Sequence, residues 1–259
     1  MPAKVVGLFR YPVKGLSAEP QASVDLHAGR GFPGDRAFAL ASPTNAFDEA
    51  APVALRKTEF LMLARQEALA RLQTAFDPAS GHLSVLDRTR SLTKDIRTPD
   101  GRADINAFFA EFLPDDQKGR LPRLVTAPGH CFTDVGVHSP ELMHAVSMLN
   151  LASVRDVEQR IGKHLDPHRF RANVLIEGLE PWVENEWLDR DIMLGAVACK
   201  GARLTRRCPA TEVNPDTATR DINVPQELMR AYGHVNLGLY LHVVTGSTVR
   251  IGDAVSAPP

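Results

Sequence analysis

Short apolar runs separated by turn residues recur along the chain and predict a large number of strands. Residues 4–13 begin with β-branched residues and are stopped by Pro12. Residues 68–88 are typical of two strands around the turn "DPASG", although their first half also fits a helix. Further strands are predicted at the end of the glycine-rich residues 29–41, in 172–178, in 191–207 as strand, turn and strand, and in 239–255 as a hairpin around "TGS".

Three stretches instead carry apolar residues at the spacing of a helix face. Residues 103–113 place an isoleucine and three phenylalanines on one such stripe. In residues 153–162 we expect Ser153 to cap the N-terminus and Gly162 to end the helix. Residues 225–233 predict a short helix with proline in its first turn and glycine at its end. Many short strands with few helices predict a strand-rich α+β fold with curled or barrel-like sheets.

The composition is that of a soluble globular protein, with 44% hydrophobic and 24% charged residues. The 30 basic and 31 acidic residues give a formal net charge of −1. A nucleic-acid-binding protein normally has a basic excess, so we expect no nucleic-acid partner. No run approaches the roughly 20 apolar residues of a membrane span, and the N-terminus lacks the apolar core of a signal peptide. We therefore expect a cytoplasmic protein without membrane association.

A polar stretch bounded by prolines, "LPDDQKGRLP" at residues 113–122, is the best candidate for a boundary between domains. The 259 residues are enough for one large domain or two small ones. If there are two domains, we expect the boundary in this stretch, between residues 118 and 119.

The three cysteines, Cys131, Cys199 and Cys208, are widely spaced and form no CxxC pair and no disulfide framework. Cys199 lies in an apolar run and is expected to be a small core residue. Cys208 differs, because Arg206 and Arg207 precede it and a loop rich in Pro, Thr, Asn and Asp follows it. Guanidinium groups close to a thiol favour the thiolate, the form that acts as nucleophile and metal ligand. Cys208 is therefore the leading candidate for chemistry.

Several stretches match one family pattern in the same order. They are "YPVKG", "GDRAFAL", "HRFRANVLIEG", "RRCPATEVNPDT" and "GSTVRIGDAV". Together they resemble the MOSC family. More closely, they resemble chains in which a MOSC N-terminal β-barrel domain precedes the MOSC domain, the layout of the mitochondrial amidoxime-reducing components and their bacterial relatives. The resemblance implies that residues 1–118 are the N-terminal β-barrel domain, packed on a cofactor-binding MOSC β-barrel domain at residues 119–259.

In that family the cysteine of this segment ligates the molybdenum of the molybdenum cofactor, whose molybdopterin dithiolene supplies two further sulfurs. The resemblance therefore implies that Cys208 is the metal ligand and the catalytic residue. A soft thiolate suits such a metal, and a metal binds the deprotonated form. Pyridoxal phosphate is not expected as a cofactor.

The phosphate of the pterin is a dianion and needs fixed positive charge and hydrogen-bond donors. The resemblance assigns Lys14 of "YPVK" and Arg36 of "GDRAF" to this role, and the planar fork of arginine suits a phosphate. The family often has serine after the lysine, where this chain has Gly15. Backbone N–H groups are expected to replace the missing hydroxyl.

The segment "FRAN" resembles the family's "FRPN", which implies that Arg171 and Asn173 bind the pterin or its phosphate. Ala172 stands in place of the proline. Alternation along a strand would put Arg169 on the same face as these two residues, so periodicity does not choose between the arginines. A surface salt bridge is the alternative for Arg169.

Two further regions resemble pterin-contacting segments. Thr211 is expected near the metal or the pterin, whereas Asn214 stands where the family commonly has aspartate. Ser153 is also expected to contact the cofactor. The alternatives for Ser153 and its neighbour Asn150 are helix capping and turn formation.

The activity that the resemblance implies is reduction of N-hydroxylated compounds, or similar N–O substrates, by oxygen-atom transfer to the cysteine-ligated molybdenum. Such a cofactor carries the difficult chemistry, and the protein supplies ligand, orientation and charge balance. The chain has no cluster of cysteines for an iron–sulfur centre, so a separate redox partner, a haem protein, ferredoxin or flavin reductase, is expected. His234 and Glu212 are candidate general acids.

Two other functions compete with this interpretation. MOSC domains also occur fused to molybdenum-cofactor sulfurases, so the chain is alternatively a non-catalytic cofactor carrier or a sulfur-handling protein that uses a Cys208 persulfide. A hydrolase is the second alternative, with His130, His138 or His234 as base. The chain has no "GxSxG" elbow to support it.

Overall fold

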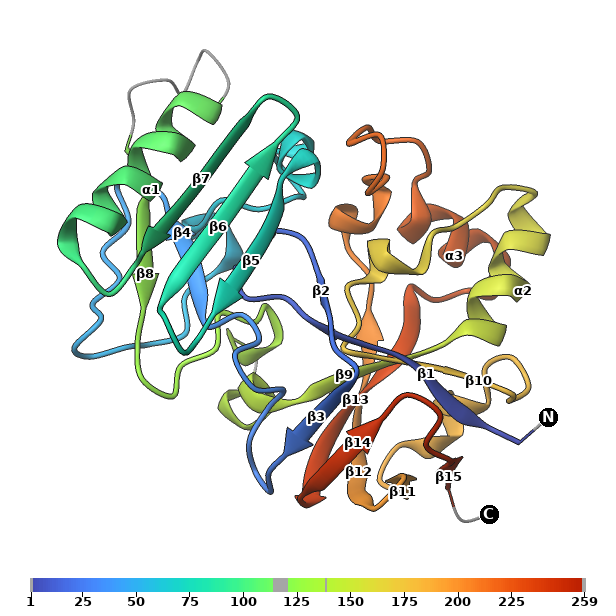
Figure 1. Cartoon of the computed structure of the whole chain (residues 1–259). Helices are drawn as coiled ribbons and strands as arrows, with labels where there is room; N and C mark the ends of the chain where they lie inside the picture. The colour runs from blue at the N-terminus through green and yellow to red at the C-terminus, as the bar shows by residue number, and fades with distance from the viewer. Residues whose placement is uncertain (1, 114–120, 138, 258–259) are drawn as a thin grey trace.

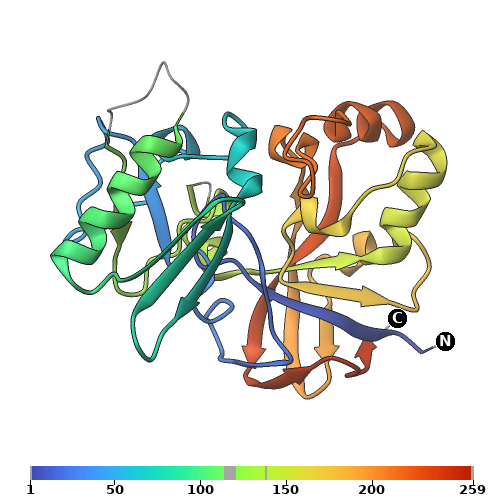
Figure 2. The same ribbon diagram turned by 45° about the horizontal axis from the view of Figure 1, so that its top comes forward.

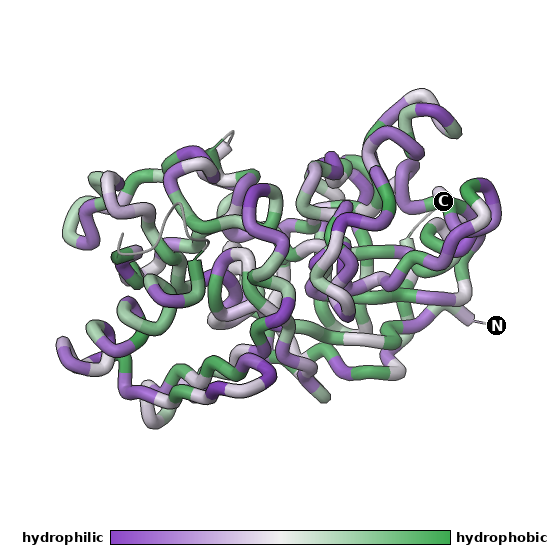
Figure 3. Tube along the Cα trace, turned by 90° about the horizontal axis from the view of Figure 1, so that it is seen from above, coloured by the Kyte–Doolittle hydropathy of each residue, from purple (hydrophilic) through white to green (hydrophobic). Residues whose placement is uncertain are grey.

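Two lobes lie side by side in the structure, a computed structural model that describes residues 2–113, 121–137 and 139–257 (Figure 1). The smaller lobe holds α1 and strands β4 to β8, and the larger lobe holds the main sheet with α2 and α3 (Figures 1 and 2). Both chain ends marked in the view from above lie at the larger lobe (Figure 3). The fold is α+β and strand-rich, as the sequence predicts.

The larger lobe is built on an eight-stranded sheet with the order β15-β11-β12-β13-β9-β10-β1-β2. The sheet curls into a barrel-like shape in which β1 reaches the segment next to β15, at the opposite end of the strand order. Lys4 of β1 forms a bridge with Ala254, and the Val5 N–H donates to the Asp253 carbonyl at 2.9 Å. The strands of this sheet are β1 (Lys4–Arg10), β2 (Glu19–Pro20), β9 (Val146–Asn150), β10 (Val174–Glu177), β11 (Asp191–Leu194), β12 (Val197–Arg206), β13 (Asn236–Thr245) and β15 (Val255–Ser256).

Alternating side chains explain how this sheet encloses a core. Leu239, Leu241 and Val243 of β13 lie in one buried cluster together with Val197 and Cys199 of β12. Cys199 is 1% exposed, and burial raises the pKa of its thiol to about 12. Its predicted role as a small core residue is confirmed.

The smaller lobe packs a three-stranded sheet, β5-β6-β7, against α1. Leu83 and Val85 of β6 are buried in the cluster that contains Ile105 and Phe109 of α1, so the alternate residues Ser84 and Leu86 face away from the helix. The elements of this lobe are β4 (Phe38–Ala41), β5 (Gln73–Asp77), β6 (His82–Asp87), β7 (Arg90–Asp95), α1 (Pro99–Phe112) and β8 (Arg123–Thr126), with the 3₁₀ helices η1 (Lys57–Glu59) and η2 (Glu67–Arg71).

Helix caps follow the sequence with one exception. In α2 (Leu151–Ile161) Gly162 ends the helix in the left-handed region at φ 67°, as predicted, but the N-cap is Asn150, whose side chain accepts a hydrogen bond from the Ala152 N–H at 3.0 Å. The predicted capping role of Ser153 is wrong, because the helix begins earlier. The remaining helices are α3 (Val224–Tyr232) and the 3₁₀ helices η3 (Val135–Val137), η4 (Pro140–His144), η5 (Pro167–Phe170), η6 (Val183–Trp187) and η7 (Pro209–Glu212).

The predicted hairpin at residues 239–255 is wrong. β14 (Ser247–Arg250) pairs with β3 (Ser23–Leu26) and not with β13. The chain changes sheets at Gly246, where a Cβ atom would lie 2.4 Å from the Leu26 carbonyl oxygen. Only glycine permits this approach, so the turn at "TGS" leads into a second sheet.

The predicted domain boundary between residues 118 and 119 lies outside the described residues. The hydrophobic core of the larger lobe nevertheless draws on both ends of the chain. Val5, Leu8 and Leu26 are buried with residues of the C-terminal strands. The first strand of the chain is thus part of the sheet that carries the site described next.

Candidate cofactor site around Cys208

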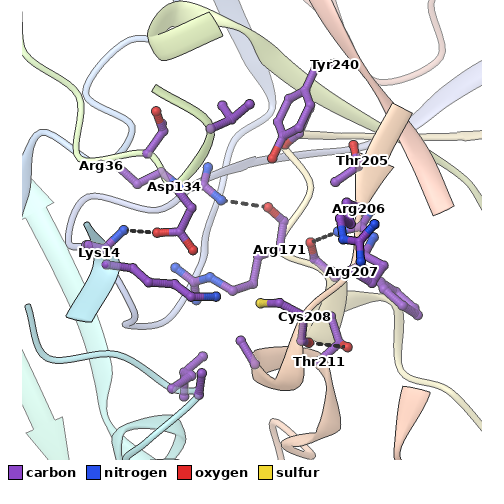
Figure 4. A pocket seen from close by; sticks show the side chains of 18 of the residues that line it. Lys14, Arg36, Asp134, Arg171, Thr205, Arg206, Arg207, Cys208, Thr211 and Tyr240 are labelled. Carbon is purple, nitrogen blue, oxygen red and sulfur yellow. Dashed lines mark hydrogen bonds and ion pairs between the residues drawn. The ribbon is translucent and has the colours of Figure 1, made fainter. Parts of the chain in front are cut away.

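A cavity of about 380 Å³ is lined by residues of both lobes and contains Cys208 in its wall. In Figure 4, Lys14, Arg36 and Asp134 lie on one side of it, and Tyr240 and Thr205 lie on the other. Cys208 lies between these two groups, directly after the end of β12.

The backbone after Cys208 is fixed by a short turn. Cys208 precedes η7, and the Thr211 hydroxyl and the Thr211 N–H both donate to the Cys208 carbonyl at 2.9 Å. The Thr211 carbonyl accepts a hydrogen bond of 3.1 Å from Arg169, which also makes two hydrogen bonds of 3.0 and 3.1 Å to Asp221. The cysteine is therefore presented by a turn that the ion pair between the buried Arg169 and the partly exposed Asp221 supports.

Arg207 is buried and bound by backbone carbonyls. Its Nε donates to Leu237 at 2.7 Å and its Nη1 to Phe170 at 2.8 Å, while Nη2 has no partner. Burial lowers the pKa of Arg207 to about 10, and Tyr240 and Cys208 act against this shift. A guanidinium without a carboxylate partner in this position favours a bound anion.

Lys14 is almost fully buried and lies beside Asp134, which is the one acidic residue among the described residues of the cavity wall. Its ammonium donates to the Phe132 carbonyl at 3.0 Å and forms an ion pair with Asp134. Burial lowers the pKa of Lys14, and Asp134 opposes that shift. For Asp134, burial raises the pKa, but Lys14 outweighs it and the pKa is lowered.

Arg36 and Arg171 both stack on the buried ring of Tyr11, at 4.7 and 4.4 Å from its centroid. Both have left-handed backbones, with φ 46° and 54°, and such strain costs about 1–3 kcal/mol each and gathers at ligand clamps. Arg36 pairs with Asp35, which more than offsets the effect of burial and raises the pKa of Arg36. Burial lowers the pKa of Arg171 to about 10, and Arg36 adds to this.

Asn173 joins three strands of the barrel-like sheet. Its side-chain oxygen accepts from the Ser147 N–H at 3.1 Å and from the Ser147 hydroxyl at 2.8 Å, and its amide donates to the Phe9 carbonyl at 3.1 Å. Asn173 lines the cavity, but its polar atoms already have protein partners. Its geometry is that of a residue that holds the cavity wall in shape.

Unpartnered polar atoms are concentrated at this cavity. In the part of the chain that the structure describes, six buried side-chain nitrogen or oxygen atoms have no hydrogen-bond partner. Four of them belong to residues of this cavity wall, Arg169, Arg171, Thr205 and Arg207. Buried polar groups are normally satisfied, so these atoms fit a bound polar ligand, and the guanidiniums among them fit an anion.

Among the described residues, no group of three or more histidines, cysteines, aspartates or glutamates is placed to hold a metal ion. Cys208 on its own is one soft ligand. A metal held by Cys208 therefore has to bring its other ligands with it, as a metal bound to a dithiolene does.

Six of the seven predicted site residues line this cavity: Lys14, Arg36, Arg171, Asn173, Cys208 and Thr211. Ser153 does not. It is fully buried elsewhere, where its hydroxyl donates to Glu184 at 2.6 Å and accepts from the Trp182 N–H at 2.8 Å. The expected contact of Ser153 with a cofactor is corrected to a role in the core.

Other expectations about single residues have mixed outcomes. Arg169 forms the ion pair considered for it, but the pair is buried on the arginine side and not at the surface. The strand alternation expected for residues 169–173 is wrong, because η5 ends at Phe170, Arg171 is its left-handed C-cap, and the strand begins only at Val174. The proposed acids His234 and Glu212 do not line the cavity, nor does His130. His138 lies outside the described residues.

The sequence interpretation missed Asp134, Tyr240, Thr205 and Tyr11. Asp134 and Tyr240 line the cavity from segments that carry none of the family motifs, so only the fold brings them here. Tyr11 belongs to the stretch "YPVKG", directly before the proline and close to Lys14, and its position offered a usable signal.

Comparison with protein families identifies this part of the chain. The MOSC domain family matches residues 135–256, a range that includes Arg171, Cys208 and Tyr240. The chain carries a MOSC domain. This match confirms the resemblance based on the "FRAN" and "RRCPATEV" motifs.

Curated proteins similar to this chain include amidoxime-reducing components. It is 28% identical over 120 residues to mitochondrial amidoxime-reducing component 1 of Mus musculus, covering 42% of this chain and 35% of the relative. The corresponding protein of Danio rerio is 27% identical over 182 residues, covering 64% and 55%. The matches thus span between about a third and about half of these curated relatives.

A solved structure, the YuaD protein of Bacillus subtilis, is 14% identical, with 98% of this chain and 94% of that chain covered and a TM-score of 0.44. None of the helices in the described residues is both long and apolar enough to cross a membrane.

Proposed function

We propose that this MOSC protein binds the molybdenum cofactor at Cys208 and reduces N-hydroxylated compounds or related N–O substrates. The observation that carries the proposal is the set of unpartnered buried polar atoms on Arg169, Arg171, Thr205 and Arg207 around one accessible thiol. The MOSC family is associated with this cofactor, and the related proteins named above are amidoxime-reducing components.

The residues of the cavity fit a cofactor with an anionic end and a soft metal. Lys14, Arg36 and Arg171 would hold the phosphate, because all three are cationic residues of the cavity wall and Arg171 Nη2 has no protein partner. Cys208 would ligate the metal, with Thr211 fixing the backbone of the ligand. When bound, the cofactor supplies the oxygen-atom acceptor for an N–O substrate.

The protein's own contribution is orientation and charge. Arg207 stabilises negative charge close to Cys208, since its Nη2 has no protein partner. Asp134 opposes the lowering of the Lys14 pKa by burial and so favours the ammonium form. The reaction consumes two electrons and two protons and releases water, and a separate redox protein is proposed as the electron source.

The test is substrate-dependent oxidation of the reduced metal. Molybdenum-loaded protein, reduced with a chemical reductant that is then removed, is mixed with benzamidoxime in the absence of any partner. We expect one benzamidine per molybdenum and the loss of the reduced-metal signal. Full cofactor loading without oxidation by any N–O compound contradicts the reductase and supports a cofactor carrier.

A further inference from the structure

A second cavity, of about 890 Å³, adjoins the first. Five residues line both: Gly15, Leu63, Arg169, Arg171 and Ala210. Ala210 follows Cys208 by two residues, so the shared wall lies next to the proposed metal ligand. The second cavity extends from there to β5, β6 and η2 of the smaller lobe.

Most charged side chains of this second cavity are already satisfied within the protein. Each of the following pairs joins a basic to an acidic side chain: Glu19 to Arg10 at 2.6 Å, Arg71 to Asp87 at 2.6 Å, His168 to Asp166 at 2.8 Å, and Arg169 to Asp221 at 3.0 Å. Charges neutralised in this way offer little to an ionic ligand.

Apolar side chains make up much of the remaining wall. Leu16, Leu72 and Val213 line it, and so does Leu86 of β6, which is 47% exposed. Leu86 lies on the face of β6 opposite α1, and Ser84 on the same face also lines the second cavity.

The unpartnered polar atoms lie at one end of this arrangement. Arg169 Nε and Arg171 Nη2 are both buried without a partner, and both residues belong to the shared wall. The shared wall near Cys208 thus offers unpartnered guanidinium nitrogens, and the second cavity extends from it along leucine and valine side chains and charged groups that are mostly paired. Such a site fits an amphipathic molecule.

We propose that the second cavity binds the apolar body of the substrate, whose N–O group lies at Cys208. This inference rests on the proposed function of Cys208, and it names the substrate class as N-hydroxylated compounds with an extended hydrocarbon part. Each methylene that enters the cavity strengthens binding by burying apolar surface.

The test uses straight-chain amidoximes from propanamidoxime to dodecanamidoxime, with reduced benzyl viologen as electron donor so that no protein partner is needed. A buried methylene contributes about 0.8 kcal/mol, so kcat/KM is expected to rise about two- to fourfold per methylene until the cavity is full. Calorimetric Kd values of the corresponding amidines are expected to fall in parallel.

Two variants locate the hydrocarbon chain. Leu86→Asp is expected to flatten the rise with chain length and to leave propanamidoxime reduction unchanged. Ser84→Leu, on the same face of β6, reduces the volume of the second cavity. The increase of kcat/KM with hydrocarbon length is therefore expected to stop at a shorter amidoxime than in wild type. The matched control is Val244→Asp, because Val244 is 54% exposed and lines neither cavity. It is expected to behave as wild type.

The outcomes separate the inference from the proposed function. If kcat/KM and the amidine Kd do not change with hydrocarbon length while propanamidoxime is still reduced, the inference is overturned and the proposed reaction stands. If kcat/KM of Leu86→Asp rises with hydrocarbon length as in wild type, the inference is also overturned, because the hydrocarbon part then lies outside the second cavity. If no amidoxime is reduced but amidine binding still strengthens with length, the cavity keeps its role and the proposed reaction fails.

Discussion

Arg36 Nη2 donates a hydrogen bond of 2.8 Å to the backbone carbonyl of Arg171, and both guanidiniums lie over the ring of Tyr11. Residues that are 135 positions apart in the chain are thereby held as one cationic unit. Both arginines contact the ring of Tyr11, which lies between β1 and the turn that carries Lys14.

The first prediction concerns this ring. Tyr11→Leu removes both cation–π contacts, each worth about 0.5–2 kcal/mol, and is expected to weaken binding of the pterin about 10-fold or more. Tyr11→Phe keeps the ring and loses only a long 3.4 Å hydrogen bond to Ala172, so it is expected to bind nearly as wild type. Retained pterin, measured by fluorescence after dialysis, distinguishes the variants. Equal retention in both contradicts the positioning role.

The second prediction concerns pH. A phosphate dianion needs protonated Lys14, whose pKa burial lowers and Asp134 raises. Asp134→Asn removes the opposing effect, so the pKa of Lys14 falls further and the ammonium loses its proton at a lower pH. Cofactor retention is expected to decline at a lower pH in the variant than in wild type, when both are dialysed across pH 7 to 10. Coincident curves contradict the assignment.

The third prediction separates the turn from the ligand. Thr211→Val removes the hydroxyl bond to the Cys208 carbonyl and is expected to cost about 1 kcal/mol of folding free energy and part of the bound molybdenum. Thr211→Ser restores the bond and is expected to recover both. The molybdenum-to-pterin ratio is the measurement, and a normal ratio in Thr211→Val shows that the turn does not position the ligand.

The fourth prediction tests the corrected role of Ser153. Ser153→Ala leaves the buried carboxylate of Glu184 without one of its donors and is expected to lower the free energy of unfolding by about 1–3 kcal/mol. Cofactor content per folded protein is expected to stay at the wild-type level, because Ser153 is outside the cavity wall. Denaturant unfolding and pterin fluorescence measure the two effects, and a specific loss of cofactor reverses the correction.

Local sequence predicted much of this structure, and its errors have physical causes. β1, α1, α3 and the β5–β6 hairpin follow from period, caps and turn residues that act over a few positions. The pairing of β14 with β3 depends on a contact across the whole chain, between Gly246 and Leu26, which no local pattern encodes.

The residues of the site also divide into those that local sequence motifs indicate and those that only the fold brings to the cavity. Cys208, Lys14, Arg36 and Arg171 carry motif signals, and the fold brings them to one cavity. Asp134 and Tyr240 enter it from loops and strands whose sequences look ordinary. Ser153 was misplaced because a small polar residue near a helix start fits several roles, and the Glu184 carboxylate that binds it is distant in sequence.

The most direct test of the central claim is the molybdenum and pterin content of wild type, Cys208→Ser and Cys131→Ser, all purified from the same cofactor-proficient host supplied with molybdate. Cys131 is partly buried, as Cys208 is, but lies outside the Cys208 cavity, which makes it the matched control. We predict near-stoichiometric molybdenum in wild type and Cys131→Ser, and a sharp loss in Cys208→Ser. Equal molybdenum in all three proteins, or none in a host that loads a control enzyme, would contradict Cys208 as the metal ligand.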